Sequence, residues 1–250
     1  MANRLARVVR RTEDALVFLP VFTLAALLIA EAAARKVFNT GIRNSGVYIE
    51  HLVLVAAFAA AAVASREKRH LALASGMFLP ERVRRIADTV TAALAAALAL
   101  TFGLCSLSFA RNAFAAAERV GFLPKRLVVL VMAAGFLAMS ARFVAGIGRT
   151  RTRALTAAAA AVLGLFLGFE PLVGLLTAGG TKALPGLAAA AAFLKPLAAA
   201  AAGPLIAVLI VAAFFGLPIF AVLGGIGLLL FIRGGLPLEI VPNQAYGVLT

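Results

Sequence analysis

The chain has 250 residues, of which 63% are hydrophobic and only 14% are charged, and its mean hydropathy is +1.04. Soluble domains usually carry about a quarter charged residues, so this composition excludes an ordinary soluble protein and indicates a membrane protein. The net charge of +14 would suggest nucleic-acid binding in a soluble chain. Here the basic residues form short clusters between apolar runs, as in the loops of membrane proteins, so we expect no nucleic-acid partner.

Four apolar segments in the first 150 residues are long enough to cross a bilayer, which requires about 20 helical residues. Arg142 lies near the end of the fourth segment, where a long side chain can reach the interface. Abundant alanine favours close packing between the helices. The sequence therefore predicts an all-α, polytopic membrane fold whose first four helices span residues 15–34, 48–65, 89–110 and 127–147.

The connection between the second and third spans, residues 65–88, mixes apolar residues with six Arg and Lys residues. This pattern predicts a helix that lies among the lipid headgroups and that could be joined to the third span. Pro80 followed by Glu81 indicates a new helix start. The segments on the N-terminal side of the predicted membrane carry twice as many Lys and Arg residues as the opposite loops, which predicts a cytoplasmic N-terminus.

The rest of the chain is rich in Ala, Gly and Pro. Residues 154–176 are expected to form a fifth span, broken late at Glu170-Pro171, and residues 177–203 an external connector with a surface-lying helix. Residues 205–232 are expected to form a sixth span, kinked at Gly216 and Pro218. Six spans would place both ends in the cytoplasm. The tail has no terminating pattern, so we expect a chain that is cut short.

No phosphate-binding loop, metalloprotease motif or serine-hydrolase motif occurs. We therefore expect no enzyme activity, no catalytic or substrate-binding residue, and no metal or other cofactor. His51 and His70 lie near opposite ends of the second span, too far apart to share a metal, and both are expected at a membrane interface. Cys105 lies in an apolar run and is expected to pack there.

Glu50, at the start of the second span, is the most distinctive acidic residue. A carboxylate at the mouth of a span is costly unless it is paired or hydrated. It is expected to pair with a basic residue of the preceding loop, at Arg35, Lys36 or Arg43, or else to carry a proton or an ion. Glu31 stands four residues before Arg35, which predicts an ion pair along the first helix.

Residues 35–73 resemble the signature of the small membrane subunit of TRAP transporters, the tripartite ATP-independent periplasmic family. The matching residues are Arg35, Phe38, Asn39, Glu50 and His70, with Arg66 and Arg69 before the histidine. Tyr48 stands near the usual Trp, and His51 replaces a second acidic residue. The resemblance implies a structural role for the matching residues, in a four-helix domain covering residues 1–153.

Residues 209–235 resemble the first helix of the large TRAP subunit. The two resemblances together imply a fused chain, with residues 154–203 as linker helix and connector and residues 204–250 as the start of the large subunit. The implied function is sodium-coupled uptake of a carboxylate-type solute across the bacterial inner membrane. The chain would anchor the large subunit, and its partners would be the remainder of that subunit, a periplasmic binding protein and lipids. Sodium would bind in the remaining part of the large subunit. The alternative is a membrane assembly or signalling protein that binds lipid through its basic interfacial helix.

Overall fold

The computed structural model describes residues 2–67, 80–115, 118–120, 123–148, 150–177 and 185–249, and nearly all of them are helical. Helices suit so apolar a chain because they satisfy their backbone hydrogen bonds internally. The only strands in the described residues are β1 (Arg119–Val120) and β2 (Leu123–Pro124), which pair antiparallel. The helices are α1 (Ala2–Phe38), α2 (Ser45–Arg66), α3 (Glu81–Asn112), α4 (Lys125–Ala145), α5 (Thr150–Leu167), α6 (Phe169–Thr177), α7 (Pro185–Phe214), α8 (Ile219–Arg233) and α9 (Ile240–Leu249).

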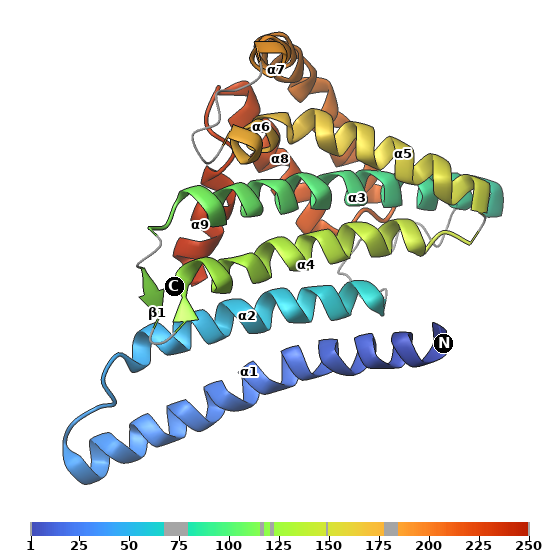
Figure 1. Ribbon diagram of the computed structural model, residues 1–250. Helices are drawn as coiled ribbons and strands as arrows, with labels where there is room; N and C mark the ends of the chain where they lie inside the picture. Colours follow the sequence, from blue (N-terminus) through green and yellow to red (C-terminus); the bar gives the residue numbers. More distant parts are fainter. Residues whose placement is uncertain are drawn as a thin grey trace.

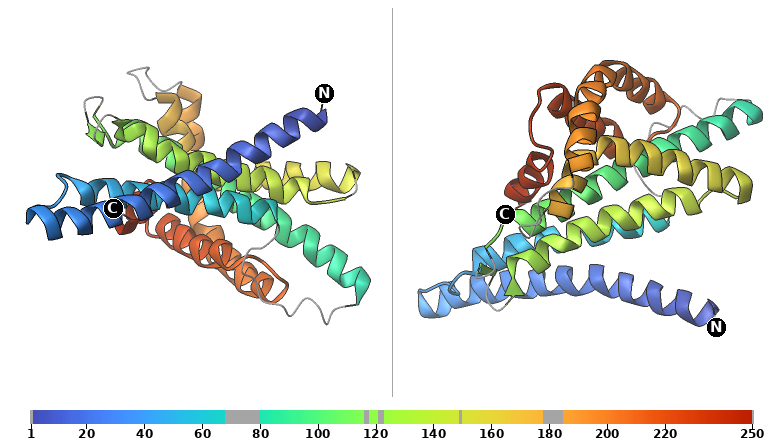
Figure 2. Two further views of the ribbon diagram at one scale, coloured as in Figure 1. Left: turned by 90° about the horizontal axis from the view of Figure 1, so that it is seen from below. Right: turned by 45° about the horizontal axis from the view of Figure 1, so that its top comes forward.

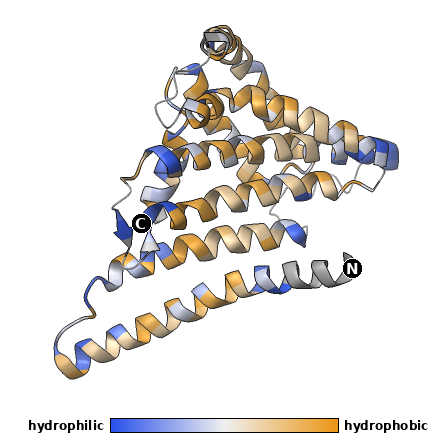
Figure 3. Ribbon diagram, viewed as in Figure 1, coloured by the Kyte–Doolittle hydropathy of each residue, from blue (hydrophilic) through white to orange (hydrophobic). Residues whose placement is uncertain are grey.

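Five helices, namely α1, α2, α3, α4 and α7, are long and apolar enough to cross a membrane. The bent pair of α5 and α6 makes six if it counts as one span, and α8 is a shorter apolar helix. In Figure 3 the helices are mostly hydrophobic along their length, and several helix ends and loops are hydrophilic. The predicted all-α polytopic membrane fold is confirmed, with its first four spans in α1 to α4.

The first five helices lie side by side in the order α1, α2, α4, α3 and α5. Contacts run from α1 to α2, from α2 to α4, from α4 to α3, and from α3 to α5 (Figure 1). Helices α7 and α8 pack against one another on the side of the bundle away from α1 (Figure 2). The central α3 is the most buried of the long helices, because it contacts both halves of the chain.

Helix boundaries follow residues with special backbone preferences. The turn from α1 to α2 contains Asn39 and Asn44 at φ of 52° and 60°, a left-handed conformation that asparagine tolerates better than most residues. Helices α3, α4 and α8 each begin directly after a proline, at Pro80, Pro124 and Pro218. Proline favours a helix start because it lacks the N–H that a helix interior requires. The start predicted at Pro80-Glu81 is confirmed, and residues 81–88 continue into the third span. Residues 65–66 of the predicted interfacial segment belong to α2, and residues 68–79, with His70, lie outside the described residues.

The break predicted late in the fifth span is present, two residues before Glu170. Helices α5 and α6 meet at an angle of 71° at Gly168, three residues before Pro171. The Gly168 N–H still bonds to the Gly164 carbonyl at 2.8 Å. Pro171 lies in the first turn of α6, where a missing N–H costs nothing because first-turn donors have no partner inside the helix. Neither residue therefore leaves a helix hydrogen bond unmet at this bend.

The prediction of a sixth span kinked at Gly216 and Pro218 is wrong, because the chain reverses there. Helix α7 ends at Phe214 and α8 returns alongside it: a Cβ atom added to Gly225 would lie 2.8 Å from Leu209 Cδ1 across the hairpin. Gly216 has φ of +93°, which L side chains rarely adopt, so the turn requires glycine. Residues 185–203 belong to the same helix as residues 204–214, so the boundary placed after residue 203 falls inside α7.

The two ends of the described chain lie at opposite ends of the bundle (Figure 1). We call "inner end" the end that holds Arg66 of α2 and Arg142 of α4, and "outer end" the end that holds His51 at the start of α2. Glu13 of α1 bonds to Arg66 at the inner end, whereas Tyr246 of α9 bonds to His51 at the outer end. The expectation that both ends share one side is therefore wrong.

Candidate functional site at the helix junctions

Four charged residues join α1, α2 and α4 at the inner end. Arg66 donates to Glu13 at 3.0 Å and to Asp14 at 2.7 Å. Arg142 donates to the second oxygen of Glu13 and to the carbonyl oxygen of Ala62. The Glu13, Arg66 and Arg142 side chains are each less than a fifth exposed. Arg142 therefore forms a link between helices and does not simply extend to the interface.

Glu31 organises the outer hairpin between α1 and α2. Its carboxylate accepts from Arg35 Nε at 2.8 Å, which confirms the predicted pair, and from the backbone N–H of Ile42 at 2.7 Å. Glu31 thus ties the end of α1 to the loop that follows. Phe38 ends α1 with its side chain 72% exposed, and Asn39 begins the turn.

Glu50 lies on the second turn of α2 and is half-buried. It forms no ion pair with Arg35, Lys36 or Arg43, all of which the structure describes. The predicted partners are therefore wrong, and Glu31 fills the role that the sequence suggested for Glu50. The signal for Glu31 was its spacing from Arg35; its contact with Ile42 depends on the loop conformation, which no sequence pattern indicates.

The loop between α3 and α4 is closed by Glu118. This carboxylate accepts from the Ala115 N–H at 2.9 Å and from Lys125 Nζ at 3.3 Å. The Ala115 N–H, followed by the Lys125 ammonium, holds the pKa of Glu118 below its ordinary value. Arg126 donates to the Phe114 carbonyl, at 2.6 Å from Nη2. These contacts hold the loop against the start of α4.

The C-terminal helices attach to α2 and α3 through polar contacts at the outer end. Ser108 of α3 donates to the Glu239 carboxylate, and Asn112 donates to the same oxygen at 3.3 Å. His51 Nδ1 lies 2.7 Å from the Val47 carbonyl oxygen, so that nitrogen carries the hydrogen. In the neutral ring, Nε2 then accepts from the Tyr246 hydroxyl at 2.8 Å.

The His51 contact was missed by sequence reasoning. The histidine lies at the predicted outer end of the span but is only 7% exposed, and its partner is 195 residues away. The His51 and Tyr246 rings also meet edge to face, and Tyr246 packs on Phe109 and Phe114. No local pattern in the sequence indicates this contact.

An apolar core joins α8 to α3. A Cβ atom added to Gly224 would lie 2.9 Å from the Phe102 ring, and one added to Gly225 would lie 2.8 Å from Leu98 Cδ1. Leu228 and Leu229 of α8 belong to the same buried cluster. The two glycines therefore permit close contact between the helices, as small residues do in membranes.

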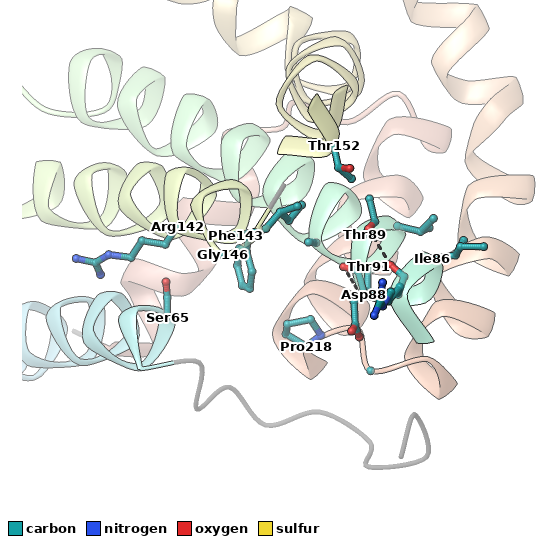
Figure 4. Close-up of a pocket in the computed structure, with 16 residues that line it drawn as sticks. Ser65, Ile86, Asp88, Thr89, Thr91, Arg142, Phe143, Gly146, Thr152 and Pro218 are labelled. Carbon is teal, nitrogen blue, oxygen red and sulfur yellow. Dashed lines mark hydrogen bonds between the residues drawn. The ribbon is translucent and has the colours of Figure 1, made fainter. Parts of the chain in front are cut away.

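A groove of about 980 Å³ lies at the inner end, between the ends of α2 and α4, the starts of α3 and α5, and the turn from α7 to α8. Ser65, Asp88, Thr91, Phe143 and Pro218 line it (Figure 4). The Arg142 side chain extends away from the other labelled residues, and Asp88 brings a negative charge. Two arginines line the groove, Arg85 and Arg142, and each is already paired with a carboxylate, of Glu81 and Glu13 respectively. Among the described residues, no group of three or more His, Cys, Asp or Glu residues could hold a metal ion.

These features define a multi-pass membrane protein whose polar side chains connect helices to one another. Residues 24–153 match the family model for tripartite ATP-independent periplasmic transporters, DctQ component. The chain belongs to this family of TRAP transporter small membrane components. The family is one of transporter components and not of enzymes, and its members work with a large membrane subunit and a periplasmic binding protein.

Neither the curated proteins nor the solved structures contain a match to the chain. The match to the family covers α2, α3 and α4 completely, together with residues 24–38 of α1. It ends near the start of α5, so α6 to α9 lie beyond it.

Proposed function

We propose that the chain is the membrane scaffold of a sodium-coupled TRAP transporter that takes up a carboxylate-type solute delivered by a periplasmic binding protein. The observation that carries this proposal is the shared core of α3 and α8. Helix α3 belongs to the family-matched part, whereas α8 belongs to the segment that resembles the start of a large subunit. A scaffold requires such a permanent, close-packed interface.

The use of the acidic residues supports the same role. Glu13 bonds to arginines of α2 and α4, Glu31 bonds to the hairpin loop, and Glu239 bonds to α3. Each joins elements of the scaffold. A coupling site for an ion requires oxygen ligands directed at a common point, usually near broken helices at the membrane midplane. We therefore assign sodium and solute binding to the remaining part of the large subunit, and the inner end to the cytoplasm of a bacterial cell.

Reconstitution tests this assignment. Liposomes that contain the chain alone, with an inward sodium gradient and the periplasmic binding protein added, should accumulate no solute. Liposomes that also contain the remaining part of the large membrane subunit should accumulate it. A matched sample with that remaining part but without the chain should lose uptake or retain little. Sodium-dependent uptake by the chain alone would contradict the scaffold role, as would full uptake without the chain.

A further inference from the structure

The hairpin of α7 and α8 meets α3 halfway along the membrane-spanning part of α3. Gly224 and Gly225 of α8 lie against Phe102 and Leu98 of α3. These two α3 residues flank the centre of residues 89–110, a stretch that contains no charged side chain. A helical stretch of this length matches the thickness of the hydrocarbon region, so its centre marks the level of the bilayer midplane.

The turn between α7 and α8 therefore lies within the inner half of the membrane. Helix α8 begins directly after Pro218 and reaches Gly224 six residues later. At about 1.5 Å per residue, the turn is about 9 Å from the midplane, whereas the hydrocarbon region extends about 15 Å on each side. On α7, Phe214 follows Leu209, which contacts Gly225, by five residues. In both views of Figure 2 the turn lies short of the inner tip of α3.

Irregular backbone at this depth requires polar surroundings. Gly216 has φ of +93°, and α8 begins without a side-chain cap, so its first N–H groups have no partner within the helix. In membranes such backbone occurs only where protein covers it or where it lines a water-filled cavity. Leu217 is fully buried in the core on one side of the turn. On the other side, Gly216 and Pro218 line the groove of about 980 Å³, which we call the inner groove.

The walls of the inner groove carry polar groups that suit water. Asp88 contributes an exposed carboxylate, and Thr152 contributes a partly exposed hydroxyl. Ser65 lines the groove from α2 and is 8% exposed, and its hydroxyl has no hydrogen-bond partner within the described structure. An unsatisfied buried hydroxyl is costly, and water in the groove would satisfy it. Figure 4 shows these three side chains together with Pro218 around the groove.

We propose that the inner groove is a water-filled vestibule open at the inner surface, and that α7 and α8 form a re-entrant hairpin whose turn is hydrated through it. Water and small hydrophilic ions reach the turn by this route, while the lipid-facing surfaces at the same depth stay dry. The volume of about 980 Å³ is far larger than the share of one water molecule, about 30 Å³. The vestibule does not depend on the proposed transport role.

Cysteine reactivity distinguishes wet from dry positions at one depth. Ala92 lines the inner groove, whereas Leu155 is 72% exposed on the face of α5 away from it. Helices α3 and α5 both start at the inner end, and Ala97 of α3 packs with Ala160 of α5. Ala92 and Leu155 each precede their member of that pair by five residues, so they lie at the same level. Each would be changed to Cys together with Cys105→Ala, in lipid vesicles with a charged methanethiosulfonate reagent on both sides.

Ala92→Cys should react at least about tenfold faster than Leu155→Cys, because the reactive thiolate forms readily only in water. Thr152→Cys, at the start of α5 and near the mouth of the groove, should react as fast as Ala92→Cys or faster. In denaturing detergent all three should react at similar rates, which verifies that each thiol is intact. Val90→Cys, at another position in the groove wall, keeps the test valid if Ala92→Cys does not fold.

Three results would overturn the proposal. Slow reaction of Ala92→Cys with fast reaction of Thr152→Cys would mean that lipid or polypeptide closes the groove before it reaches the turn. Slow reaction at both positions would mean that water does not enter the groove at all. Fast reaction of Leu155→Cys would place this level outside the hydrocarbon region, so that the hairpin would not be re-entrant.

Discussion

Glu13 joins α1 to two other helices, although α1 buries few of its own apolar side chains. Phe18, Phe22 and Ile29 are 68%, 61% and 71% exposed. Apolar contacts between helices are weak in a bilayer because lipid tails are equally apolar, so polar contacts contribute a larger share. Polar contacts hold α1 at two points, by Glu13 at the inner end and by Glu31 at the outer hairpin.

Glu13→Gln should destabilise the protein by about 1–3 kcal/mol, because two partly buried arginines lose their shared anion. Reversible unfolding in micelles, followed by circular dichroism, would measure the free energy. Glu50→Gln is the matched control. Because Glu50 lacks its predicted ion-pair partners, we expect its free energy of unfolding to change by about 0.5 kcal/mol or less. A double-mutant cycle of Glu13→Gln with Arg142→Met should show a coupling energy above about 0.5 kcal/mol. Additive effects would mean that the two residues do not interact.

At the scale of the helices, α8 can pack closely against α3 because two of its glycines lie on the face that meets α3. Gly224 and Gly225 face Phe102, Leu98 and Leu209, whereas Gly227 has no heavy atom within 4 Å of its added Cβ position. Glycine therefore permits a close helix contact at Gly224 and Gly225, whereas Gly227 faces open space.

Gly225→Val should weaken the attachment of α8 to α3 by about 1–3 kcal/mol, since the added methyl groups overlap two leucine side chains in a packed core. Gly227→Val changes helix propensity by a similar amount but meets nothing, so it isolates the packing cost. Reversible unfolding of the two variants in micelles, followed by circular dichroism, would measure the difference in the free energy of unfolding. An equal loss in Gly225→Val and Gly227→Val would contradict the role of Gly225.

For the molecule as a whole, the hairpin of α7 and α8 decides where the chain ends. Helix α7 approaches the inner end, where Gly216 and Pro218 line the groove with Arg142 and Thr152. Helix α8 then returns, so that Glu239 meets Ser108 at the outer end. The hairpin of α7 and α8 thus begins and ends toward the outer end of the bundle.

Cysteine labelling in intact cells tests this topology. In a Cys105→Ala background, single cysteines at Asn44 and Asn243 should react with an impermeant maleimide, because both positions belong to the outer end, which we assign to the cell exterior. A cysteine at Thr150, at the inner end, should react only after the membrane is permeabilised. Labelling of Asn44 without Asn243 would show that α7 and α8 do not form the hairpin described above.

The first four spans and the Glu31–Arg35 pair could be predicted because they depend on local patterns. A run of about 20 apolar residues must be helical in a bilayer, and residues four apart on a helix are neighbours. The partners of Glu13, His51 and Glu239 could not be predicted in this way. Their contacts join residues 53 to 195 positions apart, and depend on which helices become neighbours.

The amino-acid sequence alone is sufficient to identify a helical membrane protein, since composition and hydrophobic run length decide whether a segment enters the bilayer. The resemblance of residues 35–73 to the TRAP small-subunit signature can also be seen in the sequence. The sequence does not show whether the chain reverses or only kinks at Gly216 and Pro218. The packing of α8 against α7 shows that it reverses. Glycine and proline weaken a helix in both cases. The direction that the chain takes afterwards depends on the surface available for packing, and here Leu98, Phe102 and Leu209 provide it for α8.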